Sequence, residues 1–253
     1  ALVFWGEDKV KRRFTFDEVH ARVSVLAQAL TAAGIEPGDR VAGYLPNMPE
    51  TIIAMLAASS LGAVWSSGSP DFGVTGVLDR LSQIGPKVLF AADGYRYNGK
   101  RHDSLEKTAA IVAGLKGLET VVIIPYGDET VDLGSFPRAI TLDDFTGDFQ
   151  PGDITFAPLP FDHPLYILFS SGTTGAPKCI VHSQGGALLK HASEQILHCD
   201  IHEGDRVFFF TTCGWMMWNW LTSGLATGST IVLYDGSPLH PDAGRLFRMI
   251  DRN

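Results

Sequence analysis

The chain alternates short apolar runs with helical segments, and this alternation limits the folds open to it. Four strand-like runs lie at residues 41–45, 63–67, 87–91 and 120–124. Between them, helical patterns occur near residues 49–62, 74–84 and 104–115. Strands joined through helices pair in parallel and are covered by helices on the faces of the sheet. We therefore predict an α/β fold built on mostly parallel sheets.

Individual signals place the ends of these elements. From residue 17 to residue 33, apolar side chains recur at steps of three and four, and Gly34 stands where a left-handed C-terminal cap belongs. Pro49 opens the next helix, because proline suits a first helical turn. Near the N-terminus, residues 2–5 and 13–16 flank a polar stretch and predict a short hairpin.

The domain organisation follows from a change in composition. Residues 125–164 are rich in Gly, Asp and Pro and carry little periodicity. We predict that they connect a first α/β subdomain at residues 1–124 to a second at residues 165–253. A helix expected from Pro241 onward is not followed by the strand that the rhythm requires, so we expect the second subdomain to be truncated.

The two subdomains carry the same markers. Gly-Asp-Arg-Val begins at Gly38 and again at Gly204, and Gly-Ser-Pro begins at Gly68 and again at Gly236. Between the markers, both parts read strand, helix, strand. The matched order and spacing predict an internal structural repeat, and hence two similar, mostly parallel sheets.

Composition excludes several classes of protein. With a net charge of −8 and only one short basic cluster near the N-terminus, the chain lacks the basic stripe of a nucleic-acid-binding protein. Its longest apolar runs fall well short of the roughly 18 residues that a membrane span needs. The three cysteines show no paired spacing, which argues against a disulfide framework or zinc site and favours a cytoplasmic location.

One loop carries the clearest chemical signal: Ser170-Ser-Gly-Thr-Thr-Gly-Ala-Pro-Lys178, between two strand-like runs. Gly172 and Gly175 allow successive N–H groups to turn toward one point, and Lys178 adds a cation. Four hydroxyl side chains add further donors: Ser170, Ser171, Thr173 and Thr174. Such a set suits a polyphosphate. Pro177 excludes the helix that follows a Walker A lysine, so strand–loop–strand geometry is expected. An ordinary hairpin loop is the alternative.

The same loop resembles the signature of the adenylate-forming superfamily, which includes acyl-CoA synthetases, adenylation domains and luciferases. Residues 38–50 and 55–65 are similar to segments of acetyl-CoA synthetases, and residues 65–72 and 212–220 resemble acetoacetyl-CoA synthetases more narrowly. The resemblance covers nearly the whole chain. It implies the fold of the large N-terminal domain of these enzymes.

The resemblance also implies an acid–thiol ligase reaction. Acetoacetate would attack the α-phosphate of Mg-ATP, giving an acyl-adenylate and pyrophosphate, and the thiol of CoA would then displace AMP. Residues 170–178 would hold the phosphates, with Lys178 as the catalytic cation and Thr174 as the Mg²⁺ contact. Acetate or propionate is the rival carboxylate.

Several segments of the family are not found in this sequence, namely those for adenine, magnesium and ribose and the C-terminal domain with its catalytic lysine. We therefore expect the chain alone to be inactive. If it naturally ends at Asn253, a noncatalytic nucleotide-binding module is the alternative.

The resemblance assigns a substrate pocket to the segment that begins at Gly214. Trp215 and Met216 would wall the acyl site. Asn219 could donate a hydrogen bond to an oxygen of the substrate, because an amide buried without a partner is costly. A buried amphipathic helix is the alternative interpretation of these residues.

A basic segment matches the region where acetyl-CoA synthetases contact the CoA nucleotide. It supplies Arg96, Lys100 and Arg101, and the planar guanidinium fork suits phosphate. The neighbouring tyrosines could stack on adenine. A solvated basic loop is the alternative.

Overall fold

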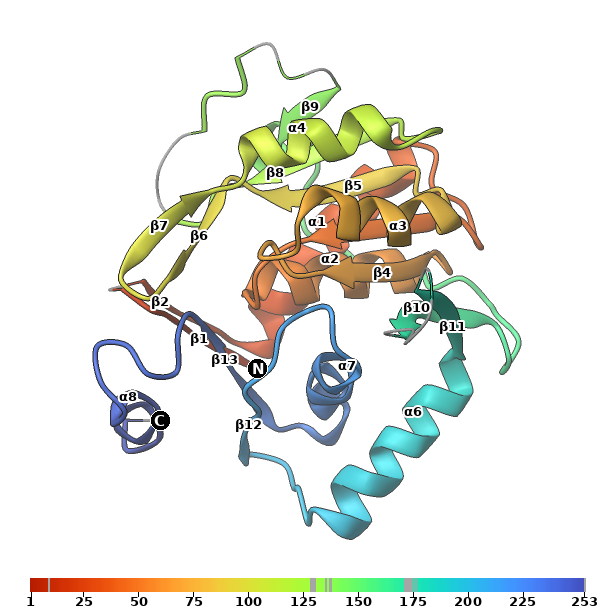
Figure 1. The fold of residues 1–253 in the computed structure, drawn as a ribbon. Coiled ribbons are helices and arrows are strands. Elements are labelled where there is room, and N and C mark those ends of the chain that lie inside the picture. The colour runs from red at the N-terminus through yellow and green to blue at the C-terminus, as the bar shows by residue number, and fades with distance from the viewer. Residues whose placement is uncertain are drawn as a thin grey trace.

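The computed structural model describes residues 1–253 except residues 9, 128–130, 135, 137, 171–174, 176 and 253. It contains a larger sheet, a smaller sheet and a separate two-stranded ribbon, with helices packed on the sheets (Figure 1). The predicted α/β class is confirmed. In the described part of the chain, no helix is both long and apolar enough to cross a membrane.

The larger sheet has seven strands in the order β11-β10-β4-β3-β5-β8-β9. All neighbours pair in parallel except β10 and β11, which form an antiparallel hairpin. Its strands are β3 (Arg40–Tyr44), β4 (Val64–Gly68), β5 (Val88–Ala92), β8 (Thr120–Ile124), β9 (Ala139–Thr141), β10 (Pro164–Ser170) and β11 (Lys178–Ser183).

The smaller sheet has four strands in the order β12-β13-β1-β2. The N-terminal strand pairs in parallel with β13 and antiparallel with β2, so the predicted N-terminal hairpin is confirmed. Its strands are β1 (Leu2–Gly6), β2 (Lys11–Phe14), β12 (Arg206–Phe208) and β13 (Thr230–Asp235). The ribbon consists of β6 (Gly94–Tyr97) and β7 (Lys100–Asp103).

The helices begin and end where local chemistry favours it. Thr15 and Glu18 form a capping box at the start of the first helix, Pro49 opens the second, and Gly85 ends the third with a left-handed φ of 54°. The helices are α1 (Phe16–Ala32), α2 (Pro49–Ser60), α3 (Val74–Ile84), α4 (Leu105–Gly114), α5 (Leu142–Thr146), α6 (Gln184–Ala192), α7 (Met216–Ser223) and α8 (Arg245–Ile250). A π-helix η1 (Ser193–His198) extends α6, and a 3₁₀ turn η2 (Gly224–Thr227) extends α7.

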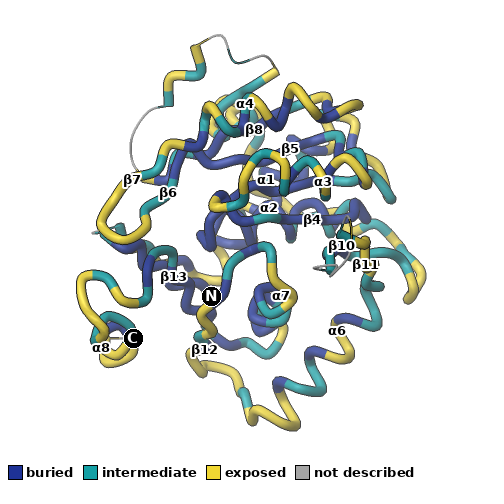
Figure 2. Tube along the Cα trace, viewed as in Figure 1, coloured by how far each residue is buried: buried dark blue, intermediate teal, exposed yellow. Residues whose placement is uncertain are grey.

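Alternate side chains of each strand enter different cores. On β5, Val88 and Phe90 pack with α1 and α2, whereas Leu89 and Ala91 pack with α3 and α4. The first of these cores also includes Leu2, on the smaller sheet, so the two sheets share it. Figure 2 shows the resulting buried centre, with exposed residues along α6 and at the tip of the ribbon.

Strand pairing does not follow the order of the sequence. The hairpin at residues 2–14 belongs to the smaller sheet, together with strands from the end of the chain. Conversely, β10 and β11 belong to the larger sheet. The division at residues 124 and 165 therefore stays a proposal for subdomains, and strand pairing crosses it. The two sheets are also less alike than we predicted, with seven strands and four.

The predicted repeat is present in the backbone. In both units the backbone carbonyl of the turn aspartate accepts a hydrogen bond from the first residue of the second strand. Asp39 accepts from the Val64 N–H and Asp205 from the Thr230 N–H, each at 2.7 Å. The turn glycines Gly38 and Gly204 have φ angles of 85° and 86°. Each unit then continues as a strand, a helix and a parallel strand.

Candidate active site

A cleft of about 380 Å³ lies where carboxyl ends of strands from both sheets meet. Residues 69–71 follow β4, residues 210–212 follow β12, and residues 234–236 end β13. The ribbon closes one side with residues 95–97 and His102. Crevices at the carboxyl ends of parallel strands are the usual ligand sites of α/β proteins, so this cleft is the first candidate for a site.

Asn47 joins the two repeats at the cleft. Its Oδ1 accepts a hydrogen bond from Trp218 Nε1 at 2.9 Å, and its Nδ2 lies 3.5 Å from the carbonyl oxygens of Thr211 and Tyr234. Asn47 is 3% exposed. One side chain after β3 therefore fixes both α7 and the end of β13, and sequence reasoning did not single it out.

Asp235 forms part of the cleft with an unusual carboxyl group. Its Oδ2 is inaccessible to solvent, and among the described residues this oxygen has no hydrogen-bond partner. The buried hydroxyl of Tyr126 likewise has no partner at hydrogen-bond geometry among the described residues, but it lies close enough to Asp235 to lower the pKa of that carboxyl group. Burial first, and then the charge of Glu7, raise the pKa of Asp235 to about 7.

Only the ends of the predicted phosphate-binding loop lie among the described residues. Ser171, Gly172, Thr173 and Thr174 lie outside the described residues. Ser170 pairs with Lys178 across β10 and β11, so the predicted strand–loop–strand geometry is confirmed.

The described ends of the loop suit a ligand. Gly175 has a φ of 124°, which side-chain-bearing residues rarely adopt, and no described atom lies within 4 Å of the place that a Cβ would occupy. Lys178 is exposed. On α3, Gln83 donates to the carbonyl of Pro177 at 2.8 Å and so anchors the base of the loop.

The three predicted CoA contacts lie on the β6–β7 ribbon rather than in a loop. Arg96 is part of the cleft wall and pairs through Nε with Asp8 at 2.6 Å. Arg101 pairs with the buried Asp93 at 2.7 Å, at the root of the ribbon. Lys100 is exposed beside the turn. The Asn-Gly dipeptide at residues 98–99 is a strong hairpin signal and could have revealed the ribbon from the sequence.

The predicted acyl residues separate into two environments. Trp215 and Met216, at the start of α7, are 64% and 45% exposed. Asn219 is 1% exposed, and neither Nδ2 nor Oδ1 of its side chain has a hydrogen-bond partner among the described residues. The turn before α7 contacts the end of β4, where Ser67 donates to the carbonyl of Cys213 at 2.7 Å.

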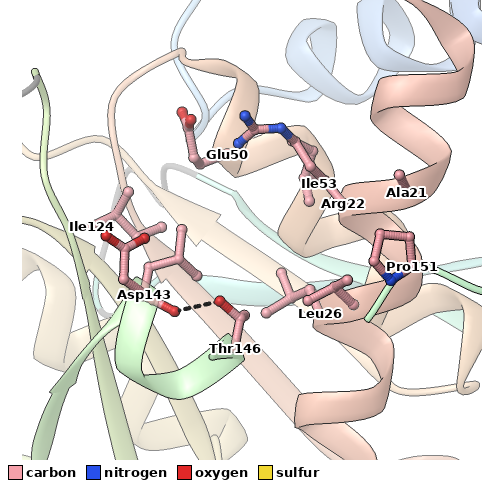
Figure 3. A pocket seen from close by; sticks show the side chains of 11 residues that line it. Ala21, Arg22, Leu26, Glu50, Ile53, Ile124, Asp143, Thr146 and Pro151 are labelled. Atoms are coloured by element: carbon pink, nitrogen blue, oxygen red, sulfur yellow. Dashed lines mark hydrogen bonds between the residues drawn. The ribbon is translucent and has the colours of Figure 1, made fainter. Parts of the chain in front are cut away.

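A second cavity lies away from these residues, between α1, α2 and α5 (Figure 3). Its walls are mostly apolar, with Arg22, Glu50 and Asp143 as charged members. Glu50 already forms a two-pronged ion pair with Arg12, at 2.5 and 2.9 Å. None of the predicted site residues lines this cavity, and we assign it no function.

Comparison with known proteins decides the family. The AMP-binding enzyme family matches residues 1–253. The chain belongs to the AMP-binding enzyme family. Acetoacetyl-coenzyme A synthetase of Rhizobium meliloti (strain 1021) is 58% identical over 247 residues, which are 98% of this chain and 38% of that protein. Malonamoyl-CoA synthetase vrtB of Penicillium aethiopicum is 47% identical, over 91% of this chain and 33% of that protein.

A solved AMP-binding structure confirms the fold. The acetoacetyl-CoA synthetase from Streptomyces lividans superposes with a TM-score of 0.94 at 45% identity, covering all of this chain and 38% of that one. The chain thus spans well under half the length of the relatives that it matches. The resemblance drawn from the loop and from residues 212–220 is confirmed at the level of the family.

Nothing in the described residues marks a ready-made metal centre in this AMP-binding chain. No group of three or more His, Cys, Asp or Glu side chains gathers there at metal-binding distances. The predicted Mg²⁺ contact, Thr174, lies outside the described residues. The acids Asp8 and Asp93, which hold the ribbon arginines, were not predicted.

Proposed function

We propose that the protein containing this chain is an acetoacetate–CoA ligase. The observation that carries the proposal is 58% identity to an acetoacetyl-CoA synthetase over nearly the whole chain. Because the chain spans 38% of that relative, the activity is proposed for the whole protein rather than for these 253 residues. The candidate site is consistent with it.

The reaction would proceed in two steps. A carboxylate oxygen of acetoacetate attacks the α-phosphorus of ATP, the bond from that phosphorus to the bridging oxygen breaks, and pyrophosphate leaves. The sulfur of CoA then attacks the acyl carbon, and AMP leaves with the electron pair of the acyl–oxygen bond. Bound Mg²⁺ would neutralise phosphate charge. Lys178 would do the same from the β10–β11 loop, by position and charge rather than covalent chemistry.

The acyl end of the proposed site would lie at the start of α7. Trp215 and Met216 offer exposed apolar surface for a short chain. Acetoacetate and malonamate share a second carbonyl at carbon 3, separated from the carboxyl carbon by one methylene group, and relatives named for both acids match this chain. The unpartnered amide of Asn219, also on α7 and 1% exposed, is our proposed donor to that second carbonyl.

The CoA end of the proposed site would be the cleft beneath the ribbon. Tyr95, Tyr97 and Phe210 give it aromatic walls, onto which a purine can stack, and Arg96 adds a cation. Arg101 and Lys100, on the adjacent strand, would add positive charge near the phosphates. We also propose a cytoplasmic location, where all three substrates would be available.

A pyrophosphate-release assay of the protein as encoded tests the proposal. Acetoacetate, acetate, propionate and 3-hydroxybutyrate would each be supplied with Mg-ATP and CoA. We expect kcat/KM for acetoacetate to exceed the others by roughly tenfold or more, because a site that hydrogen-bonds a substrate oxygen discriminates against acids that lack it. Equal or faster turnover of acetate or propionate would instead favour an acetyl- or propionyl-CoA synthetase.

A further inference from the structure

The β6–β7 ribbon needs support from outside itself. It belongs to neither sheet, and an isolated two-stranded hairpin is marginally stable in water. In Figure 1 it leans away from the larger sheet toward the ends of β1 and β2. Its position sets one wall of the cleft, so whatever holds it also sets the shape of the candidate site.

Glu7 holds the tip of the ribbon. Asn98 and Gly99 form the turn with φ angles of 53° and 77°, which leaves their N–H groups pointing outward side by side. Glu7 Oε2 accepts the Asn98 N–H at 2.8 Å, and Oε1 accepts the Gly99 N–H at 2.5 Å. Adjacent turn amides form an anion-binding concavity, and here the carboxylate of Glu7 fills it.

The same carboxylate also binds the second Gly-Ser-Pro marker. Glu7 Oε2 accepts the N–H of Ser237 at 2.6 Å. A Cβ on Gly236 would lie 2.4 Å from the Cβ of Glu7, so only glycine permits this approach. Glu7 is 7% exposed and therefore joins three segments, the end of β1, the ribbon turn and the end of β13, at a nearly buried point.

The other acids near the ribbon act on its side chains instead. Asp8 pairs with Arg96, and Asp93 pairs with Arg101 while also accepting the N–H of Tyr126 at 2.8 Å. Asp93 thus fixes the root of the ribbon. Glu7 fixes the backbone of the tip, which carries Lys100 next to the turn.

We propose that Glu7 is a positioning residue that holds the ribbon over the cleft and thereby sets the affinity for the CoA nucleotide. This inference rests on the proposed function. Because the turn amides are already taken by Glu7, phosphates of the thiol substrate meet the side chains of the ribbon and not its backbone. The acyl-adenylate step, which uses the β10–β11 loop, does not depend on the ribbon.

The test compares Glu7→Gln with Glu106→Gln in the protein as encoded. Glutamine keeps the shape of Glu7 but replaces one acceptor oxygen with an NH₂ group. Glu106 is an exposed acid on α4 and serves as the matched control. Hydrogen exchange of the Asn98 and Gly99 amides reports the ribbon. Acetoacetate-dependent ATP–pyrophosphate exchange reports adenylate formation, and thioester formation gives the KM for CoA.

For Glu7→Gln we expect at least tenfold faster exchange at Asn98 and Gly99, a KM for CoA raised about tenfold, and adenylate formation within twofold of wild type. Unchanged amide exchange overturns the inference even if the protein has no ligase activity, so the two failures remain distinguishable. Faster exchange with an unchanged KM for CoA overturns it as well. If Glu7→Gln does not fold, Asp8→Asn is measured instead, because it weakens the partly exposed pair with Arg96 on the same ribbon. It must raise the KM for CoA, but by less than the tenfold expected for Glu7→Gln.

Discussion

At the scale of single residues, Asp235 gives the molecule a pH dependence of defined sign. Burial raises its pKa to about 7, whereas in the unfolded chain it ionises near 4. Between these values the unfolded state loses the proton and the folded state keeps it, so stability falls as pH rises from about 4 to 7. Asp235→Asn removes this loss. We expect the variant to exceed wild type by roughly 2–4 kcal/mol in unfolding free energy at pH 7.5, and by much less at pH 5.

Urea unfolding of both proteins at several pH values measures the difference. Tyr126→Phe is the comparison variant, because it leaves the carboxyl group in place and removes the hydroxyl that lowers the pKa of Asp235. That variant should keep the fall in stability with pH and extend it to higher pH than in wild type. Parallel pH profiles for wild type and Asp235→Asn would contradict the assigned pKa.

The residue types in the sequence predicted the chemistry of the candidate site better than they predicted the contacts within it. The loop lysine and the Trp215 segment could be proposed from their motifs. The pairing of Arg96 with Asp8 could not be predicted, because Asp8 lies on a distant segment. The pairing of Arg101 with Asp93 could not be predicted either, because it depends on the ribbon, which was not expected. Asn219 was expected beside the substrate, and its nearly complete burial depends on how α7 rotates against its neighbours.

At the scale of elements, the repeated turn provides an internal comparison. Asp39 and Asp205 each accept a backbone N–H three residues earlier, at 2.9 and 2.7 Å. Only Asp39 also receives Lys87 Nζ, at 2.7 Å, and its side chain is 14% exposed against 52% for Asp205. Burial acts to raise the pKa of Asp39, but the hydrogen bonds from Lys87 and from the Glu36 N–H together outweigh it and hold the pKa below its usual value.

We therefore expect unequal losses from the same substitution in the two turns. Asp39→Ala removes a charge-assisted bond in a partly buried site and should lower unfolding free energy by about 2–3 kcal/mol. Asp205→Ala should cost about 0.5–1 kcal/mol, as exposed pairs do. Chemical denaturation of the two variants measures both values. Equal losses would mean that the Lys87 contact adds nothing to the turn.

Elements with local signals were predicted well, and those defined by distant partners were not. The Pro49 start, the left-handed Gly34 and the β10–β11 hairpin followed from local chemistry. The short strand β9 is defined by its pairing with β8, which periodicity does not show. The expected helix from Pro241 begins later, at Arg245, because a turn at residues 243–244 precedes it.

At the scale of the whole molecule, the N-terminal strand links the two ends of the chain. Strand β1 lies between β13 and β2, so the hairpin at residues 2–14 and the strands within residues 206–235 form one sheet. Sequence order predicted two consecutive subdomains, because composition marks linkers but does not reveal which strands pair. The two sheets also share one core, in which Phe4 is fully buried.

The shared core predicts that damage near residue 4 spreads to distant elements. Phe4→Ala should lower unfolding free energy by about 3–5 kcal/mol, because it leaves a cavity between the sheets. Since β1 and β13 exchange backbone hydrogen bonds, the amides of β13 should lose protection against hydrogen exchange together with those of β1. Phe16→Ala removes the same ring from a 47% exposed site and should cost less than about 1 kcal/mol. If Phe4→Ala weakened protection only within residues 1–14, the N-terminal hairpin would be an attachment to the fold and not part of its centre.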